Sequence, residues 1–128
     1  MTEMHKAILP WPVSVNAMYG TNRSGKVFLK KKGKAYKDAC GIILAQEKCH
    51  FTGKEDRVWL TIEVYPPDNR KRDISNLIKI VEDSIPWFTD DSQVDKILIE
   101  RFEIDPRKKG YIIICCGAYD KSTRQDKL

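Results

Sequence analysis

The chain has 128 residues, a formal net charge of +5 and a pI of about 9.0. This length suits one domain with a modest core, so residues 1–128 are interpreted as a single domain. The sequence contains no apolar run near the ~18 residues of a membrane span, and its first residues lack the apolar segment of a signal peptide. We therefore expect a cytoplasmic protein. The positive charge favours an anionic partner, although charge alone is a weak signal.

The four cysteines do not have the spacing of a zinc site. Cys40, Cys49, Cys115 and Cys116 form no Cys-x-x-Cys pair. Cys115 and Cys116 are neighbours in a predicted strand and should point to opposite faces. Reduced thiols are therefore the better interpretation.

The N-terminal part is predicted to form a strand and a hairpin. The strand covers residues 5–9 and ends at Leu9-Pro10-Trp11-Pro12, because proline cannot donate to a β-ladder. The turn signature Asn22-Arg23-Ser24-Gly25 then separates residues 17–19 from residues 26–29, which is the pattern of a hairpin.

A run of lysines follows the hairpin, with Lys30, Lys31 and Lys32 in succession. Such a run is usually a solvated surface, and that interpretation stays open here. A second basic cluster, Arg70-Lys71-Arg72, lies further along the chain. Binding to a phosphate backbone requires cations gathered in this way, so both clusters are candidate DNA contacts.

A helix and a strand are predicted for the middle of the chain. The helix covers residues 34–49, with Gly33 directly before it, and its apolar stripe consists of Tyr36, Ala39, Cys40, Ile43 and Leu44. The strand covers residues 58–65, where a period of two places Val58, Leu60, Ile62 and Val64 on one face. It leads into the basic cluster, which therefore lies at a strand-to-helix junction.

A second helix is predicted directly after the basic cluster. Apolar side chains recur at the i, i+3, i+4, i+7 spacing of one helical face, about 100° per residue: Ile74, Leu77, Ile78, Val81 and Ile85. Asp73 suits the N-cap, and Pro86 ends the helix because its ring and missing N–H cannot continue it. The opposite face presents Asn76, Lys79 and Asp83.

The charges around this helix favour a chemical role. An ordinary amphipathic helix with a capping aspartate needs neither the basic cluster before it nor the acidic pair Asp90-Asp91 after it. Mg²⁺ is typically held by one or two carboxylates together with waters and substrate phosphate, and it can activate a water molecule. A nearby lysine can stabilise negative charge that develops on a phosphate. The pattern indicates metal-dependent phosphodiester hydrolysis.

The C-terminal part is predicted to be a β-hairpin and a tail. A strand over residues 94–104 should pair antiparallel with residues 111–116 across a turn that carries another basic triplet, Arg107-Lys108-Lys109. The second strand is apolar and should be covered on both faces. Residues 120–128 are charged and aperiodic, which predicts a flexible tail. The fold class is α+β, a mixed β-sheet with two main helices packed on it.

The motifs resemble the RusA family of Holliday-junction resolvases, small phage and prophage nucleases. In that family a basic run precedes Asp-x-Asp-Asn, a lysine lies one turn later, and Asp-Asp-x-Gln-Val follows the helix. This chain has Asp73-Ile74-Ser75-Asn76, Lys79 and Asp90-Asp91-Ser92-Gln93-Val94. Leu9-Pro10-Trp11-Pro12 and Tyr36-Lys37-Asp38 also match, so the resemblance spans residues 7–118. Ser75 departs from the pattern, because the family usually has its second aspartate there.

The resemblance implies a RusA-like, homodimeric endonuclease that depends on Mg²⁺ or Mn²⁺ and resolves four-way DNA junctions in recombination and repair. A two-fold dimer would supply two related sites for the two cuts. A phage or prophage origin within a bacterial host is implied as well. Carried over by position, Asp73 and Asp91 are the essential acids and metal ligands, Lys79 is the catalytic lysine, and Asn76 and Asp90 are adjacent site residues.

Several assignments stay open at this point. Ser75 would hold a metal weakly or through water, and Asp83 is either a substitute ligand or a solvent-exposed helix acid. Asn16 is either a DNA contact, by resemblance, or a turn residue. The alternative function is a non-catalytic protein that binds junction or duplex DNA after losing a metal ligand. A basic scaffold protein without preference for branched DNA is a third option.

Overall fold

The computed structural model describes residues 4–46, 57–85 and 93–120. Its elements in chain order are β1 (Met4–Pro10), α1 (Val15–Met18), β2 (Tyr19–Thr21), β3 (Val27–Leu29), α2 (Lys31–Ala45), β4 (Val58–Tyr65), α3 (Asn76–Ser84), β5 (Val94–Arg101) and β6 (Tyr111–Ala118). The predicted α+β class, with two main helices and a mixed sheet, is confirmed.

The main sheet has the strand order β1-β6-β4-β5. β6 runs antiparallel to β1 and β4, whereas β4 and β5 are parallel. The predicted β5–β6 hairpin is therefore wrong, because β4 lies between these two strands. β4 and β6 carry the cleanest apolar alternation and occupy the centre, while β5, with Ile97 and Leu98 exposed, forms an edge. Residues 102–110 connect β5 to β6 across the intervening β4, a distance of about 10 Å, or two strand spacings.

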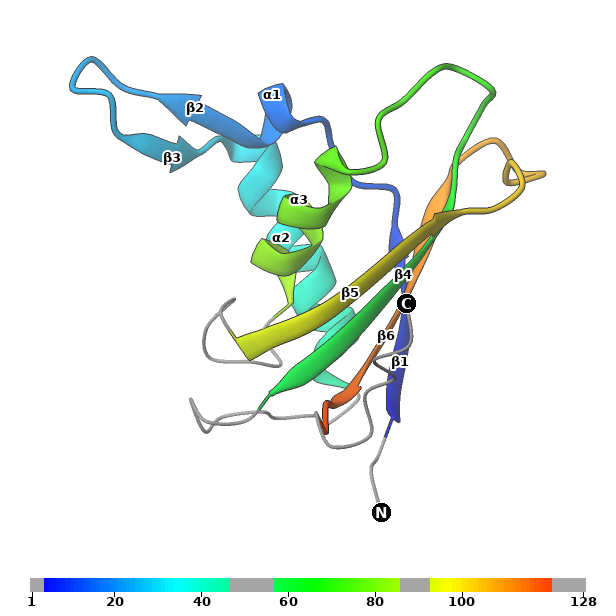
Figure 1. Cartoon of the computed structure of the whole chain (residues 1–128). Helices are drawn as coiled ribbons and strands as arrows, with labels where there is room; N and C mark the ends of the chain where they lie inside the picture. Colours follow the sequence, from blue (N-terminus) through cyan, green and yellow to red (C-terminus); the bar gives the residue numbers. More distant parts are fainter. Residues whose placement is uncertain (1–3, 47–56, 86–92, 121–128) are drawn as a thin grey trace.

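One face of this sheet is covered by helices. Figure 1 shows α2 and α3 packed together against the strands. The core lies between these layers and consists mainly of alternate residues of β4 and β6 with one stripe of each helix. β6 is buried on this face and only half-buried on the other, so the prediction that both its faces are covered is wrong. Its residues Cys115 and Cys116 do point to opposite faces, and neither forms a disulfide with another described residue.

Helix α2 begins three residues earlier than predicted, so Gly33 lies inside its first turn. A Cβ atom at Gly33 would lie 2.5 Å from the carbonyl oxygen of Met18. Glycine thus allows the short helix α1 to pack against the start of α2. The predicted end of α2, including Cys49, lies outside the described residues.

The N-terminal hairpin is shorter than predicted. Residues 17 and 18 belong to α1, because the N–H groups of Ala17 and Met18 both donate to the Ser14 carbonyl oxygen. The turn at Asn22 is confirmed: the Asn22 side-chain oxygen accepts the N–H of Lys26, and Gly25 has φ +84°. The β2–β3 hairpin extends away from the body of the molecule (Figure 1).

The structure describes only the beginning of the predicted C-terminal tail. Residue 120 closes the last described segment, and residues 121–128 of the predicted tail lie outside the described residues. Among the helices that the structure describes, none is long and apolar enough to cross a membrane.

Candidate active site

The candidate site is centred on Asp73, in the loop that leads from β4 into α3. Asp73 Oδ1 accepts the backbone N–H of Ser75 at 3.0 Å and the Ser75 hydroxyl at 2.6 Å. These hydrogen bonds lower the pKa of Asp73, and the positive charge of Arg101 lowers it further. Asp73 is therefore an exposed carboxylate, ionised at neutral pH.

The predicted helix start needs a correction here. α3 begins at Asn76, with Ser75 in the N-cap position and no side-chain hydrogen bond from that cap. Asp73 instead closes the preceding turn, where its carbonyl oxygen accepts the N–H of Asn76. At the other end, Ile85 has extended φ and ψ, as expected for a residue before proline.

Ser75 stands where a metal-binding carboxylate was expected from the family pattern. In the structure its hydroxyl donates to Asp73. The side chain thus acts on the neighbouring acid and helps to keep it ionised. A direct contact between Ser75 and a metal ion stays a prediction.

Asp68 organises the basic cluster in front of Asp73. Its Oδ1 lies 2.7 Å from Arg72 Nη1, and its Oδ2 lies 3.6 Å from Arg70 Nη2. The hydrogen bond from Arg72 is the main cause that lowers the pKa of Asp68 to about 2. The Arg72 guanidinium also lies 5.5 Å from the ring centre of Trp11. Arg72 is therefore fixed, with 24% of its side chain exposed, whereas Arg70 is 79% exposed.

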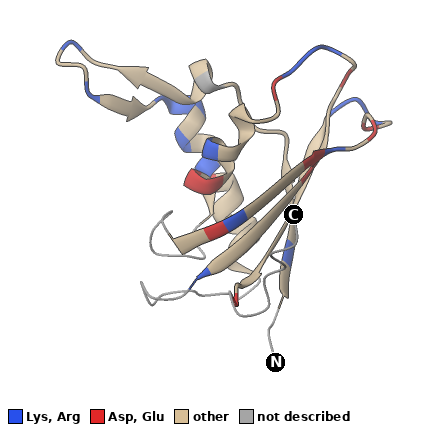
Figure 2. Cartoon of the chain, in the orientation of Figure 1, with Lys and Arg blue, Asp and Glu red and all other residues tan. Residues whose placement is uncertain are grey.

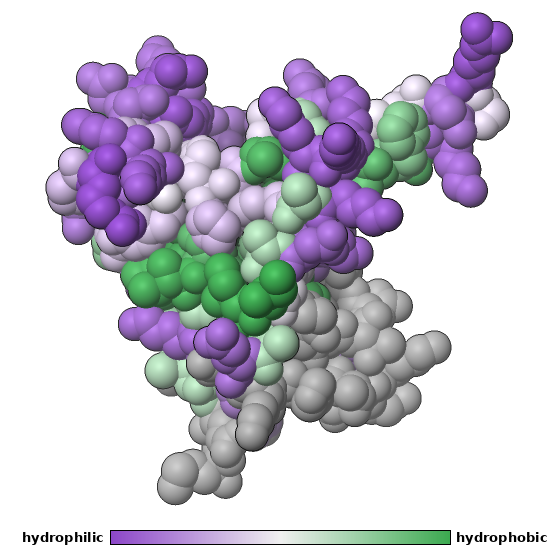
Figure 3. Space-filling model, turned by 180° about the vertical axis from the view of Figure 1, so that it is seen from behind, coloured by the Kyte–Doolittle hydropathy of each residue, from purple (hydrophilic) through white to green (hydrophobic). Residues whose placement is uncertain are grey.

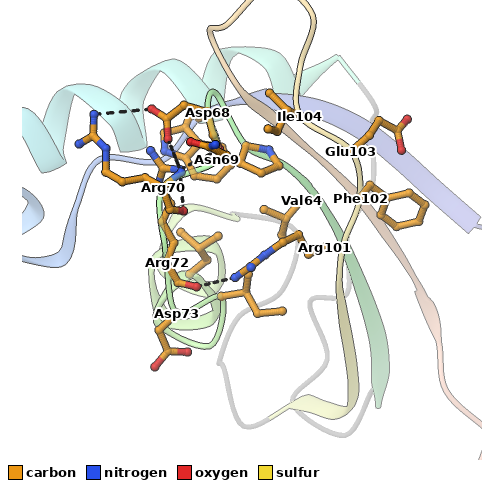
Figure 4. Close-up of a pocket in the computed structure, with 14 residues that line it drawn as sticks. Val64, Asp68, Asn69, Arg70, Arg72, Asp73, Arg101, Phe102, Glu103 and Ile104 are labelled. Atoms are coloured by element: carbon orange, nitrogen blue, oxygen red, sulfur yellow. Dashed lines mark hydrogen bonds and ion pairs between the residues drawn. The ribbon is translucent and has the colours of Figure 1, made fainter.

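Two hollows meet at Asp73. One has a volume of about 390 Å³ and lies between the basic loop and the end of β5, where Arg101 lines it (Figure 4). The other has a volume of about 530 Å³ and separates the segment around α1 from the start of α3. Four residues line both hollows: Trp11, Arg72, Asp73 and Leu77.

The larger hollow brings together polar residues from two distant parts of the sequence. Asn16, from α1, forms part of one wall, and Asp73 and Asn76 form part of the other. Lys30 supports the first wall, because its Nζ donates to the Asn16 carbonyl oxygen at 2.8 Å. Lys31 and Lys32 are exposed in the first turn of α2.

Lys79 and Asp83 form an ion pair on the polar face of α3. Lys79 Nζ lies 3.2 Å from Asp83 Oδ2, and the Tyr19 hydroxyl donates to the same carboxylate oxygen. The predicted polar face of Asn76, Lys79 and Asp83 is thus present. Asp83 lines neither hollow beside Asp73, so a direct role as a metal ligand stays a prediction.

The structure adds site residues that the sequence did not suggest. Arg101, at the end of β5, donates to the backbone carbonyl oxygen of Arg72, and its charge acts on Asp73. Its place follows from the parallel register of β4 and β5, which pairs Arg101 with Val64. The sequence did contain a signal for Asp68, because an aspartate can accept the backbone N–H of the residue two positions later. In the structure Asp68 accepts the Arg70 N–H at 3.0 Å.

The acidic pair Asp90-Asp91 lies outside the described residues. Within the described ranges, no group of three or more His, Cys, Asp or Glu side chains could hold a metal ion.

The chain is similar to a class of DNA-cleaving proteins. Residues 10–112 match the family model described as Endodeoxyribonuclease RusA. The Crossover junction endodeoxyribonuclease RusA of Escherichia coli strain K12 is 36% identical over 89 residues, which cover 67% of this chain and 72% of that protein. The chain belongs to the RusA endodeoxyribonuclease family, which confirms the resemblance seen in the sequence.

Phage proteins are among the relatives. The Crossover junction endodeoxyribonuclease rusA of Enterobacteria phage 82 is also 36% identical over 89 residues. The protein of the same name from Enterobacteria phage HK97 is 32% identical over 101 residues, which cover 76% of this chain and 82% of that protein.

Proposed function

We propose that this protein is a metal-dependent endonuclease that resolves four-way DNA junctions. The observation that carries the proposal is the ionised Asp73, placed where two hollows meet and bordered by Arg72 and Arg101. The names of the relatives specify a crossover junction as their substrate. We expect this chain to act on the same DNA, within the cytoplasm of a bacterial host.

The distribution of charge supports a DNA substrate. Residues 19–34 contain six Lys and Arg residues and no Asp or Glu. Several of these lysines crowd the N-terminus of α2, where no acid lies in the first turn. Cations at this positive end of a helix are locally unfavourable, by about 0.3–1 kcal/mol each. A bound phosphate would reverse this effect, so we infer that Lys31 and Lys32 contact the DNA backbone together with Arg70 and Lys71.

The residues at the site fit a hard divalent cation. Asp73 offers an ionised carboxylate, and Asn76 places an amide in the same hollow. Mg²⁺ or Mn²⁺ commonly needs only one or two protein carboxylates, and Asp90 and Asp91 are our candidates for the second. When bound, the ion would lower the pKa of a water molecule and polarise the phosphate.

The protein's own groups have separate tasks in this proposal. Arg72 is held by Asp68 and Trp11, so it presents a fixed positive charge beside Asp73. Arg70 is exposed and lies 3.6 Å from Asp68, a longer contact than that of Arg72, so its side chain can follow the DNA backbone. Lys79 stabilises the negative charge that develops on the phosphate during cleavage.

We infer that the active form is a homodimer, because resolving a junction requires two symmetry-related cuts. The surface offers apolar area for such an interface, as the hydrophobic band in Figure 3 illustrates. On the sheet face away from the helices, Ile8 is 58% exposed and Leu98 is 56% exposed. Sedimentation equilibrium should give twice the mass of the 14.8 kDa chain.

The test compares an end-labelled four-way junction with a linear duplex of the same arm sequence, each with and without Mg²⁺. We expect cleavage of the junction alone, and only with metal. Ser75 stands where the family pattern has a carboxylate, and its hydroxyl donates to Asp73. This replacement favours one alternative function, that of a junction-binding protein without nuclease activity. That alternative predicts selective binding of the junction without cleavage, whereas a basic scaffold protein would bind both DNAs equally.

A further inference from the structure

A cluster of three polar side chains joins the hairpin to the helix that bears Lys79. The Tyr19 hydroxyl, at the start of β2, donates to Asp83, and Asp83 pairs with the Lys79 ammonium at 3.2 Å. The ammonium also lies 5.5 Å from the centre of the Tyr19 ring. Lys79 is thus restrained by a carboxylate of its own helix and by an aromatic ring of another element.

Helix stability does not explain this pair. An acid four residues before a lysine stabilises a helix better than the reverse order, and here Lys79 precedes Asp83. The Lys79 side chain is 70% exposed, and exposed ion pairs contribute little to stability. The pair therefore needs another explanation than the stability of α3.

The arrangement restricts a side chain that is otherwise free to move. A lysine has a flexible four-carbon stem and populates many rotamers when exposed. Asp83 is the fixed end of the pair, since only 24% of its side chain is exposed and the Tyr19 hydroxyl also donates to its carboxylate. The same face of α3 carries Asn76 into the larger hollow one turn before Lys79.

The hydrogen bond between Tyr19 and Asp83 also joins the parts of the chain that carry the two walls of that hollow, although neither residue lines it. Tyr19 directly follows α1, which carries Asn16 on one wall, and Asp83 belongs to α3, which carries Asn76 on the other. Lys79, which lines neither hollow, is therefore held between these two elements, one helical turn beyond Asn76. A phosphate that extends from Asn76 along α3 would meet the ammonium already in place.

We propose that Asp83 and Tyr19 are positioning residues that hold the Lys79 ammonium at the edge of the active-site hollow. The inference rests on the proposed function, because it takes Lys79 to act on the DNA phosphate. Asp83 and Tyr19 touch neither DNA nor metal in this account. They act by keeping the ammonium in one place before the substrate binds.

The test measures the single-turnover rate of junction cleavage at saturating enzyme, and separately the Kd for the junction, for Asp83→Asn and Tyr19→Phe. A misplaced catalytic group can cost about 100-fold in rate. We expect Asp83→Asn to lower the rate by about tenfold to 100-fold with little change in Kd, and Tyr19→Phe to act in the same direction. Asp83→Glu, which keeps the carboxylate, should recover part of the rate.

A matched control removes the same charge elsewhere. Asp38→Asn changes an exposed residue of α2 that lines neither hollow, and it should cleave like the wild type. Equal melting temperatures for Asp83→Asn and Asp38→Asn would show that the rate loss does not come from unfolding. An unchanged or faster rate for both Asp83→Asn and Tyr19→Phe would overturn the proposal, as would a loss confined to Kd.

A double variant separates this inference from the proposed function. If Asp83 acts through Lys79, then Asp83→Asn should add no further loss in a Lys79→Ala background. Full activity of Lys79→Ala would instead refute the role of Lys79 itself. Strong loss in Lys79→Ala, with a further independent loss on adding Asp83→Asn, would refute only the positioning role.

Discussion

Two loops at the same end of the sheet have similar sequences but differ in the contacts that they make with the rest of the chain. One follows β4 and contains Arg70-Lys71-Arg72, and the other follows β5 and contains Arg107-Lys108-Lys109 (Figure 2). In each loop an aspartate accepts the N–H of the arginine two residues later, Asp68 from Arg70 and Asp105 from Arg107. Charge and local hydrogen bonding alone do not distinguish them.

The contacts of the two aspartates do distinguish them. Asp105 is 1% exposed, and its carboxylate accepts the N–H groups of Arg107 and Gly110 within its own turn. Asp68 is 39% exposed and holds Arg72 against Trp11, from the N-terminal segment, beside both hollows. The first aspartate closes a turn, whereas the second builds a site from distant parts of the chain. The loop after β4 is therefore the candidate DNA site, because its Arg72 contacts Trp11 from a distant part of the chain.

The largest expected difference concerns DNA binding. Replacing Arg70, Lys71 and Arg72 together with alanine should weaken binding to junction and duplex alike. The slope of log K against log salt should become shallower by about 0.9 for each DNA phosphate that the variant no longer neutralises. Replacing Arg107, Lys108 and Lys109 is the matched control and should change the slope less. Equal changes in slope for the two triple variants would contradict the distinction between the loops.

Thermal stability should depend more on the loop after β5 than on the loop after β4. Asp105→Ala leaves the buried N–H of Gly110 without its acceptor, and unsatisfied buried donors are costly. Thermal denaturation should therefore show a drop of several degrees for Asp105→Ala and a smaller one for Asp68→Ala. If Asp68→Ala melts at the lower temperature, Asp68 is the more important structural residue of the two.

The acid limb of the stability curve provides a finer comparison. Hydrogen bonding from Arg72 lowers the pKa of Asp68 from 3.8 to about 2. For Asp105, burial opposes ionisation, but hydrogen bonds from the N–H groups of Arg107 and Gly110 lower the pKa. A depressed carboxyl pKa stabilises the fold above the unfolded value, and this stability is lost as the pH falls through the folded value.

Melting temperatures measured from neutral pH down to about 2 test this statement. Asp68→Asn and Asp105→Asn should each flatten the fall in stability below the ordinary carboxyl range. An acid limb as steep as that of the wild type would show that the replaced aspartate is not the group that titrates there.

The smallest expected effect concerns Ser75, at the end of the first loop. Ser75→Asp adds a hard oxygen donor beside Asp73 and should lower the Mg²⁺ concentration that gives half-maximal cleavage. Repulsion between the two acids opposes this change, but a bound cation should overcome it. DNA affinity at saturating metal should stay nearly constant. An identical Mg²⁺ midpoint would show that this position does not face the metal.

The sequence correctly predicted the parts of the fold that are set by residues close together in the chain. The alternation from Val58 to Val64 gave β4 with its buried face, and the turn at Asn22 follows from residues within that turn. The polar face of α3 was predicted because Asn76 and Lys79 are spaced by one helical turn. These features are decided by neighbours a few residues apart.

Features that depend on distant contacts could not be predicted. Gly33 gave no local sign that it lies under Met18, and Arg101 reaches the site only because β5 pairs parallel with β4. The hydrogen bond from Tyr19 to Asp83 spans 64 residues of sequence. Ile80 was also missed on the buried side of α3, where packing against α2 and the sheet includes it.

The central claim is that Asp73 is the acid on which cleavage depends. The most direct measurement compares the wild type with Asp73→Asn on a four-way junction with Mg²⁺, with junction binding measured in the absence of metal. We predict that Asp73→Asn abolishes cleavage and binds the junction as tightly as the wild type or more tightly, because one charge that repels phosphate is removed. Cleavage by Asp73→Asn at nearly the wild-type rate would contradict the account.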